Sequence, residues 1–174
     1  MKIAVDPGHG GRDPGAVGFI TEVDIVYPWA DELVKKLNKL GCTAQLTHRK
    51  PPSNVKVTLE DRVEAAEDMK ADLYISVHAD SWTTKHAHGA SAFVYSATSS
   101  SYSIAEKILP ALQKDIGSHG GTPKIANFHV LRETSMPAVL LETGFVTNPE
   151  DGLWLMRNYK KQAKRVAEVI AGLK

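Results

Sequence analysis

Four residues of this sequence carry side chains that could bind a metal ion or move a proton beside one. His9, His78 and Glu142 each stand where a short apolar run ends, and Glu22 closes a glycine-rich loop. Short apolar runs of this kind are typical of buried strands. Ligands of open α/β sheets bind outside the carboxyl ends of the strands, so these side chains are expected to converge there.

Two imidazoles and one carboxylate form a common ligand set for catalytic zinc, which leaves the fourth position for water. A second carboxylate can then take a proton from that water and return it to a leaving amine, which is the chemistry of amide hydrolysis. The spacing does not decide whether Glu22 or Glu142 is the ligand. The residues are scattered along the chain, so no short-range helical geometry enforces their meeting, as it does in an HExxH motif.

The elements that must position these residues follow from the apolar periodicity. Residues 6–18 hold five glycines and two prolines, which predicts a loop with unusual backbone angles. Strands are expected at 2–5, 43–47, 73–78, 90–95 and 138–141, and helices at 23–40, 58–69, 102–116, 150–157 and 160–173. Pro28 should kink the first helix or keep its first turn out of α-helical form. This alternation predicts an α/β fold: one domain over 1–174 with a mostly parallel twisted sheet of about six strands and helices on both faces.

Composition excludes several classes of protein. The chain has 174 residues, a net charge of +1 and a single cysteine, so neither nucleic-acid binding nor a cysteine-ligated metal is expected. Its apolar runs are far shorter than the roughly 18 residues that a membrane span needs. The glycine-rich loop lacks the ending of a P-loop. We expect a monomer without a membrane or nucleic-acid partner.

Several segments resemble the motifs of the zinc-dependent N-acetylmuramoyl-L-alanine amidases of the Amidase_3 family. The resemblance is ordered and covers nearly the whole chain. The segments that carry it are DPGHGG at 6–11, TEVDI at 21–25, TLEDRV at 58–63, SVHAD at 76–80 and MPAVLLETGFVTN at 136–148.

This resemblance implies a role for each candidate residue. His9, Glu22 and His78 are expected to hold one Zn²⁺, and Glu142 is expected to act as the catalytic base and acid. The implied substrate is bacterial peptidoglycan, in which such enzymes cut the amide between the lactyl group of N-acetylmuramic acid and L-alanine. Arg132 matches a family segment beside the site and is expected to bind substrate, with a structural ion pair as the alternative.

Two other functions remain open at this stage. A zinc peptidase acting within the stem peptide would use the same metal chemistry, and a noncatalytic wall-binding module would keep the fold. The sequence departs from the family pattern at Asp80, where asparagine is usual, and at Pro28. Asp80 could add negative charge near the metal or hydrogen-bond a ligand.

Residues outside this set have less specific interpretations. His86 and His88 could chelate a metal, but solvated loop histidines are the expected reading. Trp82 could stack on a sugar face or pack in the core. The N-terminus shows no signal-peptide pattern. The expected setting is therefore wall lysis after release, as a phage endolysin or an autolysin freed by mother-cell lysis, or a domain from a longer secreted protein.

Overall fold

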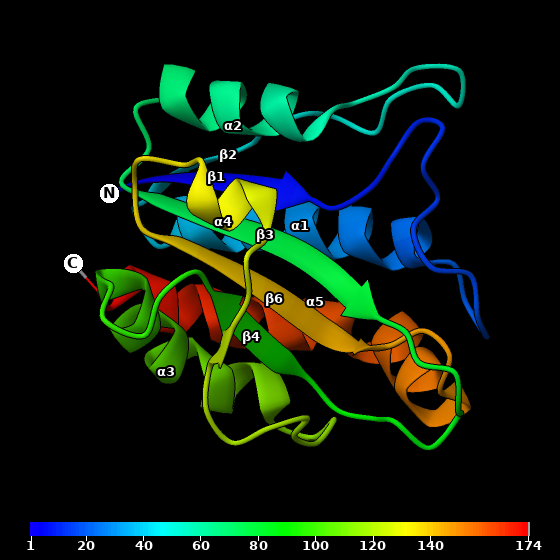
Figure 1. Ribbon diagram of the computed structural model, residues 1–174. Helices are drawn as coiled ribbons and strands as arrows, with labels where there is room; N and C mark the ends of the chain where they lie inside the picture. The colour runs from blue at the N-terminus through cyan, green and yellow to red at the C-terminus, as the bar shows by residue number, and fades with distance from the viewer. Residues whose placement is uncertain (174) are drawn as a thin grey trace.

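Strands and helices alternate along most of the chain, as the periodicity predicts. The structure is a computed structural model that describes residues 1–173 (Figure 1). In chain order its elements are β1 (Lys2–Pro7), α1 (Glu22–Lys39), β2 (Thr43–Leu46), α2 (Leu59–Asp68), β3 (Leu73–Asp80), β4 (Ser91–Val94), α3 (Ser100–Gln113), β5 (Lys124–Ile125), α4 (His129–Arg132), β6 (Ala138–Phe145) and α5 (Pro149–Ala171).

The strands form one six-stranded sheet in the order β2-β1-β3-β6-β4-β5. Strands β2, β1, β3 and β6 run parallel to one another. Strand β4 is antiparallel to β6, and the short β5 is parallel to β4. The predicted α/β class and the mostly parallel sheet are therefore confirmed.

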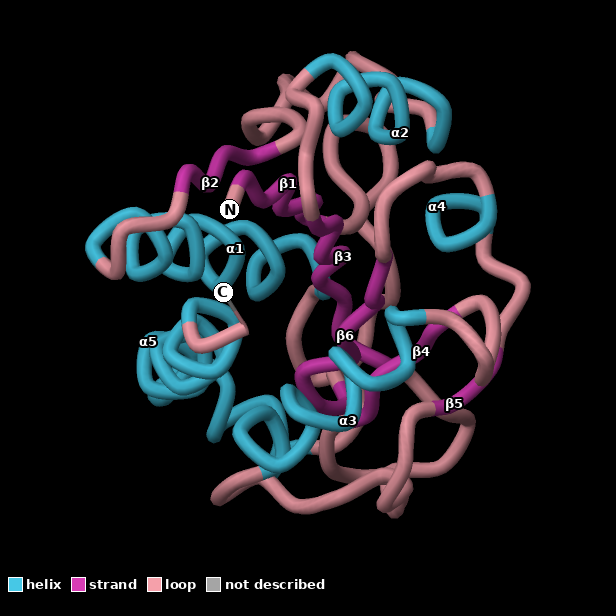
Figure 2. The backbone as a smooth tube through the Cα atoms, turned by 90° about the vertical axis from the view of Figure 1, so that its left-hand side faces the viewer, coloured by secondary structure: helices cyan, strands magenta, loops and turns pink. Residues whose placement is uncertain are grey.

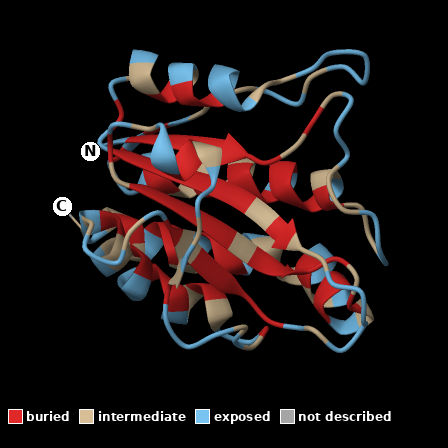
Figure 3. Cartoon of the chain, in the orientation of Figure 1, coloured by how far each residue is buried: buried red, intermediate tan, exposed pale blue. Residues whose placement is uncertain are grey.

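Helices cover both faces of the sheet, which is also as predicted. Helices α1, α3 and α5 lie on one side of the strands, and α2 and α4 lie on the other (Figure 2). Strand β1 shows why both faces need cover: Ile3 and Val5 join the core beneath α1 and α5, whereas Ala4 joins the core beneath α2. Strands β1, β3, β4 and β6 are accordingly almost wholly buried, as Figure 3 shows, whereas the outer strands β2 and β5 are partly exposed. Burial on both faces is the usual state of parallel strands.

Strands β3 and β6 extend past the limits that the sequence indicated. The predicted ends at His78 and Leu141 are wrong, because β3 runs on to Asp80 and β6 to Phe145. His78 and Glu142 thus lie inside strands. Their polar side chains do not interrupt the pairing, since the backbone ladder is independent of the face that a side chain occupies.

Three helices depart from expectation: the first turn of α1 is α-helical, the short α4 was not predicted, and α5 is continuous; a kink at Pro28 stays a prediction. Helix α1 is α-helical from Glu22 onward and continues through Pro28. Pro28 has no N–H group, so the Asp24 carbonyl lacks its helical hydrogen bond. Both residues are exposed, and water can therefore replace the missing bond. The two predicted C-terminal helices are a single helix, α5, because no glycine or proline separates their patterns. None of the described helices is long and apolar enough to cross a membrane.

Candidate metal centre

Three of the predicted residues meet at the carboxyl end of the sheet. His9 comes from the loop after β1, Glu22 from the first turn of α1, and His78 from β3. Nε2 of His9 and Nδ1 of His78 each lie 3.0 Å from Oε1 of Glu22, and the two nitrogens are 3.2 Å apart. Within residues 1–173, this is the one group of three or more His, Cys, Asp or Glu side chains spaced to hold a metal ion.

Two glycines allow the three side chains to pack this closely. A Cβ atom on Gly8 would lie 2.4 Å from Cε1 of His78, and one on Gly15 would lie 2.6 Å from Oε2 of Glu22. Gly15 also has a positive φ of 69°, which favours glycine. The glycine-rich loop is therefore shaped by the ligand side chains around which it folds.

Glu22 is buried and held by the backbone on both sides. Its Oε1 accepts a hydrogen bond from the Ala79 amide at 3.0 Å, and its Oε2 accepts one from the Ala16 amide at 2.9 Å. Burial acts to raise the pKa of the Glu22 carboxyl, but hydrogen bonds from His78 and His9 outweigh burial and lower it. The side chain is thus an anion in a fixed orientation before any metal arrives.

His9 is oriented through its other ring nitrogen. Nδ1 of His9 lies 2.8 Å from Oδ2 of Asp13, the arrangement in which a carboxylate fixes the tautomer of a metal-binding histidine. Burial acts to lower the pKa of His9, but hydrogen bonding and charge from Glu22 and then Asp13 raise it. A metal that binds here must displace the proton that these carboxylates favour.

The backbone of His9 is also constrained, by residues that the sequence analysis did not single out. His9 has a φ of 66°, an uncommon left-handed conformation for a residue with a side chain. Its carbonyl accepts a hydrogen bond from Nη2 of Arg62 at 2.8 Å and one from the Tyr27 hydroxyl at 3.3 Å. Nε2 of His48 lies 3.4 Å from the same oxygen. Three side chains from separate elements therefore converge on one strained peptide.

Arg62 is itself buried and paired with Asp6. Its Nη1 donates to Oδ1 of Asp6 and to the Pro7 carbonyl, both at 2.7 Å. Thr47 and Ser76 also donate to the Asp6 carboxylate, at 3.0 and 2.9 Å. The sequence contains one indication of this pair. Arg62 lies one turn before Ala66, on the apolar face of a predicted helix, and a charged side chain buried there needs a partner of opposite charge.

Glu142 lies beside the three clustered side chains, on the next strand. Glu142 and His78 are direct partners in the parallel β6–β3 pair. One carboxylate oxygen, Oε2, is inaccessible to solvent and has no hydrogen-bond partner within the described chain. Burial raises the pKa of Glu142 well above its ordinary value, and the negative charges of Asp80 and Glu22 add to that effect. A carboxyl group in this state is suited to accept and hold a proton.

Asp80 and Lys124 supply opposite charges near Glu142. Oδ1 of Asp80 accepts a hydrogen bond from the Ser81 amide at 2.7 Å, and the charge of Asp80 helps to raise the pKa of Glu142. Lys124 opposes that effect, and its Nζ lies 5.3 Å from the ring centroid of Phe93. Asp80 thus contributes negative charge, the first of the two roles considered for it.

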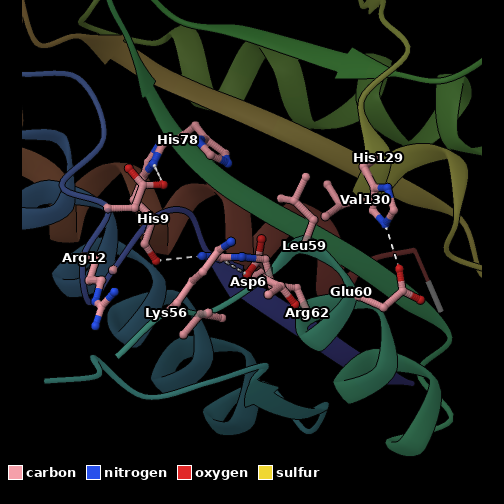
Figure 4. Close-up of a pocket in the computed structure, with 14 residues that line it drawn as sticks. Asp6, His9, Arg12, Lys56, Leu59, Glu60, Arg62, His78, His129 and Val130 are labelled. Atoms are coloured by element: carbon pink, nitrogen blue, oxygen red, sulfur yellow. Dashed lines mark hydrogen bonds and ion pairs between the residues drawn. The ribbon is translucent and has the colours of Figure 1, made fainter. Parts of the chain in front are cut away.

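A cavity of about 620 Å³ is lined by two of the three clustered side chains, His9 and His78. It runs from His9 and His78 along the start of α2 to His129, whose Nε2 lies 3.1 Å from Oε2 of Glu60 (Figure 4). Arg12 and Lys56 line the same cavity. A hollow of this size next to the carboxylates has room for part of an extended substrate.

The remaining candidates lie away from this cluster. Arg132 forms an ion pair with Glu133 at 2.5 Å and donates to Oδ1 of Asn127 at 2.5 Å, and it does not line the cavity. The ion pair with Glu133 is the structural alternative that was given for Arg132. Contact of Arg132 with substrate stays a prediction. His86 and His88 are exposed loop residues, and neither joins the metal-binding group.

The side chains present fit a zinc ion. Two imidazole nitrogens and one carboxylate oxygen converge, a carboxylate orients one of the imidazoles, and an unpartnered carboxylate oxygen lies on the adjacent strand. Zinc sites of hydrolases combine these features. Softer thiolate ligands are missing from the group, which fits a hydrolytic rather than a purely structural metal.

Comparison with known proteins gives a consistent result. Residues 3–173 match the family described as N-acetylmuramoyl-L-alanine amidase. The probable cell wall amidase LytH of Staphylococcus saprophyticus is 38% identical over 86% of this chain, and the N-acetylmuramoyl-L-alanine amidase LytC of Bacillus subtilis is 33% identical over 92%. Among solved structures, the amidase AmiC2 of Nostoc punctiforme superposes with a TM-score of 0.83 at 34% identity, covering 99% of this chain and 93% of that one.

The curated relatives are longer proteins. The aligned region makes up 49% of LytH and 33% of LytC, so the chain spans between a third and a half of their length. The match nevertheless covers almost every residue of this chain and every residue of the cluster described above. The chain therefore belongs to the Amidase_3 family of N-acetylmuramoyl-L-alanine amidases.

Proposed function

We propose that this chain is a zinc-dependent N-acetylmuramoyl-L-alanine amidase. It hydrolyses the amide between the lactyl group of N-acetylmuramic acid and L-alanine in bacterial peptidoglycan. The observation that carries the proposal is the convergence of His9, Glu22 and His78 beside Glu142, whose Oε2 has no hydrogen-bond partner among residues 1–173. Family membership and relatives named cell wall amidases support the substrate.

The proposed chemistry divides between the metal and the protein. Zn²⁺, when bound by His9, Glu22 and His78, lowers the pKa of water toward roughly 7 and polarises a carbonyl. Glu142 accepts the proton of the attacking water on a carboxylate oxygen and returns it to the amine nitrogen of L-alanine. The oxygen of the attacking water forms a new bond to the carbonyl carbon, and the amide C–N bond breaks. The products are a lactyl carboxylate and a free amine.

The surroundings of Glu142 suit this proton transfer. Burial and neighbouring negative charge raise the pKa of Glu142, which favours holding the proton taken from water. The charge of Lys124 opposes the effect and favours return of the proton. Asp13 keeps His9 oriented, and Glu22 is fixed by two backbone amides.

Substitution of Glu142 tests the division of roles. Glu142→Gln is expected to keep about one zinc per chain and to lose at least about a hundredfold in turnover, since positioned acid–base groups contribute roughly 10²–10⁴-fold. His9→Ala and His78→Ala are expected to lose both zinc and activity. Elemental analysis and release of new amino termini from purified peptidoglycan measure the two properties. Full activity in a zinc-free histidine variant would overturn the ligand assignment.

Product analysis tests the bond that is cut. The amidase reading requires fragments with a free L-alanine amine and intact glycan bearing a lactyl carboxylate. New amines from residues further along the stem peptide would identify a peptidase instead. Binding to wall sacculi with no amine release, in protein that carries zinc, would identify a wall-binding module.

We propose two possible biological settings. In the first, the protein is released from the cytoplasm by phage lysis or by lysis of a mother cell and then degrades the wall. In the second, it acts as a catalytic domain within a longer secreted protein. Relatives named cell wall amidases support action on the wall. Fractionation of the source cells before and after lysis tests this setting: enzyme found in the medium only after lysis fits release, and a longer secreted form fits the second case.

A further inference from the structure

A second, smaller hollow lies among the loops that follow β3 and β6, and it has an aromatic lining. Its volume is about 280 Å³, and it lies between the side chains of Phe19 and Trp82. Thr83, Lys85 and Thr147 also line it, so hydroxyl and ammonium groups border the aromatic rings. A pocket with apolar walls and a few polar groups is the usual form of a small-molecule binding site.

The two aromatic rings are unusually open to solvent. Trp82 is 62% exposed and Phe19 is 49% exposed, so the reading of Trp82 as a core residue is wrong. Single exposed apolar residues are common on protein surfaces and need no explanation. Two exposed aromatic side chains that line the same hollow form a cluster instead, and such clusters mark binding sites. Their exposed faces offer flat surfaces with hydrogen-bonding groups at the edge.

The walls of the hollow are fixed by hydrogen bonds between its loops. The Trp82 amide donates to Oγ1 of Thr147 at 3.1 Å, and the Phe19 amide donates to the Val146 carbonyl at 2.8 Å. Nδ2 of Asn148 donates to the Lys85 carbonyl at 2.9 Å. The backbone that carries the two aromatic rings is therefore held in place by hydrogen bonds, which lowers the conformational entropy that is lost when a ligand binds.

The three segments that line the hollow are close in sequence to residues of the proposed active site. Trp82 follows His78 by four residues, Thr147 follows Glu142 by five, and Phe19 precedes Glu22 by three. Each of the three segments is thus joined through three to five residues to a proposed metal ligand or to Glu142. A substrate long enough to extend from the metal centre past the ends of β3 and β6 can reach these rings.

We propose that the hollow between Phe19 and Trp82 binds a sugar ring of the peptidoglycan glycan strand. This inference rests on the function proposed above, because that reaction places a glycan-linked lactyl group at the metal centre. Sugar rings present apolar C–H faces ringed by hydroxyl groups, and the hollow offers aromatic faces bordered by threonine hydroxyls and Lys85. A peptide chain would need backbone hydrogen-bonding groups that these rings do not provide.

Binding of a peptide-free sugar tests the proposal without any hydrolysis. The probe is the linear tetramer of N-acetylglucosamine, which lacks both the lactyl group and the amide. Trp82 is the exposed tryptophan, whereas Trp29 is fully buried and Trp154 is partly buried against the core. Titration with the tetramer is therefore expected to change the tryptophan emission of the wild-type protein and to leave that of Trp82→Ala unchanged.

Calorimetry measures the affinity of each variant independently of fluorescence. Trp82→Ala and Phe19→Ala are expected to weaken binding by roughly tenfold each, the scale of one lost aromatic contact. Trp82→Phe keeps a ring and is expected to restore most of the affinity. Leu153→Ala, an exposed apolar residue of α5 that does not line the hollow, is the matched control and should bind as wild type does.

Three results would overturn the proposal. The first is that folded wild-type protein does not bind the tetramer, and the second is that wild type and Trp82→Ala bind it with equal affinity. The third is a self-association of wild type that Trp82→Ala abolishes, which would show that the rings bind a second copy of the chain. Failure of the amidase function is a separate result, because it appears as unhydrolysed peptidoglycan whether or not the tetramer binds.

Discussion

His9 is held at both of its ends, by its ring and by its backbone. The ring nitrogen that faces away from the metal position pairs with Asp13, and the carbonyl is fixed by Arg62 and Tyr27. A left-handed conformation at a non-glycine residue costs free energy, and the surrounding bonds must offset that cost. The affinity for a metal should therefore depend on residues that never touch it.

Gly8 provides a test of how closely the ligands must pack. Gly8→Ala places a methyl group on the His78 ring, so zinc affinity is expected to fall by about 10–100-fold, as for other changes behind metal ligands. Gly121→Ala is the control, because nothing lies within 4 Å of its added Cβ. Competition with a chromophoric chelator measures both affinities. Wild-type affinity in Gly8→Ala would show that the His78 ring is free to move.

Arg62 offers a test at the buried ion pair. Arg62→Ala leaves the Asp6 carboxylate buried without its charge partner, which is expected to lower the free energy of unfolding by about 3–5 kcal/mol. Arg157→Ala, on the exposed face of α5, should change it by less than about 0.5 kcal/mol. Urea denaturation of the metal-free proteins measures the difference. Equal stability of the two variants would contradict a structural role for the pair.

The same pair predicts a pH dependence. Burial acts to raise the pKa of Asp6, but the charge and hydrogen bond of Arg62 outweigh burial, and the pKa lies below its ordinary value. A lowered pKa in the folded state stabilises the protein above the unfolded pKa of about 3.9, and this stability is lost as the pH falls through the folded pKa. The stability difference between wild type and Asp6→Asn should therefore be present at about pH 5 and shrink progressively as metal-free protein is taken from there to well below about pH 4. A difference that stays constant over that range would refute it.

At the scale of elements, helix α2 carries Arg62 to the metal centre, and its start is defined by a capping box. Oγ1 of Thr58 accepts from the Asp61 amide at 3.1 Å, and the Asp61 carboxylate accepts from the Thr58 amide at 2.7 Å. The sequence predicted this start correctly, because a capping box is a local signal.

Removal of the cap should weaken the helix. Thr58→Ala is expected to lower the free energy of unfolding by about 1 kcal/mol, within the range of 0.5–2 for such caps. Ser103→Ala, at an exposed position inside α3, is the matched control and lacks a capping role. Urea denaturation compares the two. A loss in the control as large as that in Thr58→Ala would show that the cap itself is not responsible.

The elements that the sequence predicted poorly share a physical cause. Strand β5 has two residues and helix α4 has four, too few for a periodic pattern. The end of β6 was placed too early because Glu142 interrupts an apolar run, although the pairing with β3 continues beyond it. Convergence of His9, His78 and Glu142 was predictable from the parallel topology, whereas the contact of Arg62 with His9 depends on how α2 docks, which no local pattern contains.

At the scale of the whole molecule, the metal centre lies at the end of the sheet and outside the two hydrophobic cores. The cores beneath α1 and α5 and beneath α2 contain none of the proposed ligands. Domains of this size bury enough apolar surface to fold without a metal, unlike zinc fingers. Hydrolysis and folding should therefore respond differently to loss of the metal.

Chelation tests that separation. Removal of zinc is expected to abolish amide hydrolysis, to leave the far-ultraviolet circular dichroism unchanged, and to lower the melting temperature, because the metal binds only the native state. Restored zinc should return both activity and melting temperature. Collapse of the dichroism signal on chelation would show instead that the fold depends on the ion.

The position of β6 in the sheet has a consequence for the timing of activity during synthesis. This last strand of the chain is inserted between β3 and β4, and it brings Glu142 into line with His78. A nascent chain that ends before residue 138 lacks both a central strand of the sheet and the Glu142 carboxylate, and domains generally fold as units. Under the proposed function, a ribosome-bound fragment should accordingly be inert until β6 has been synthesised and inserted between β3 and β4.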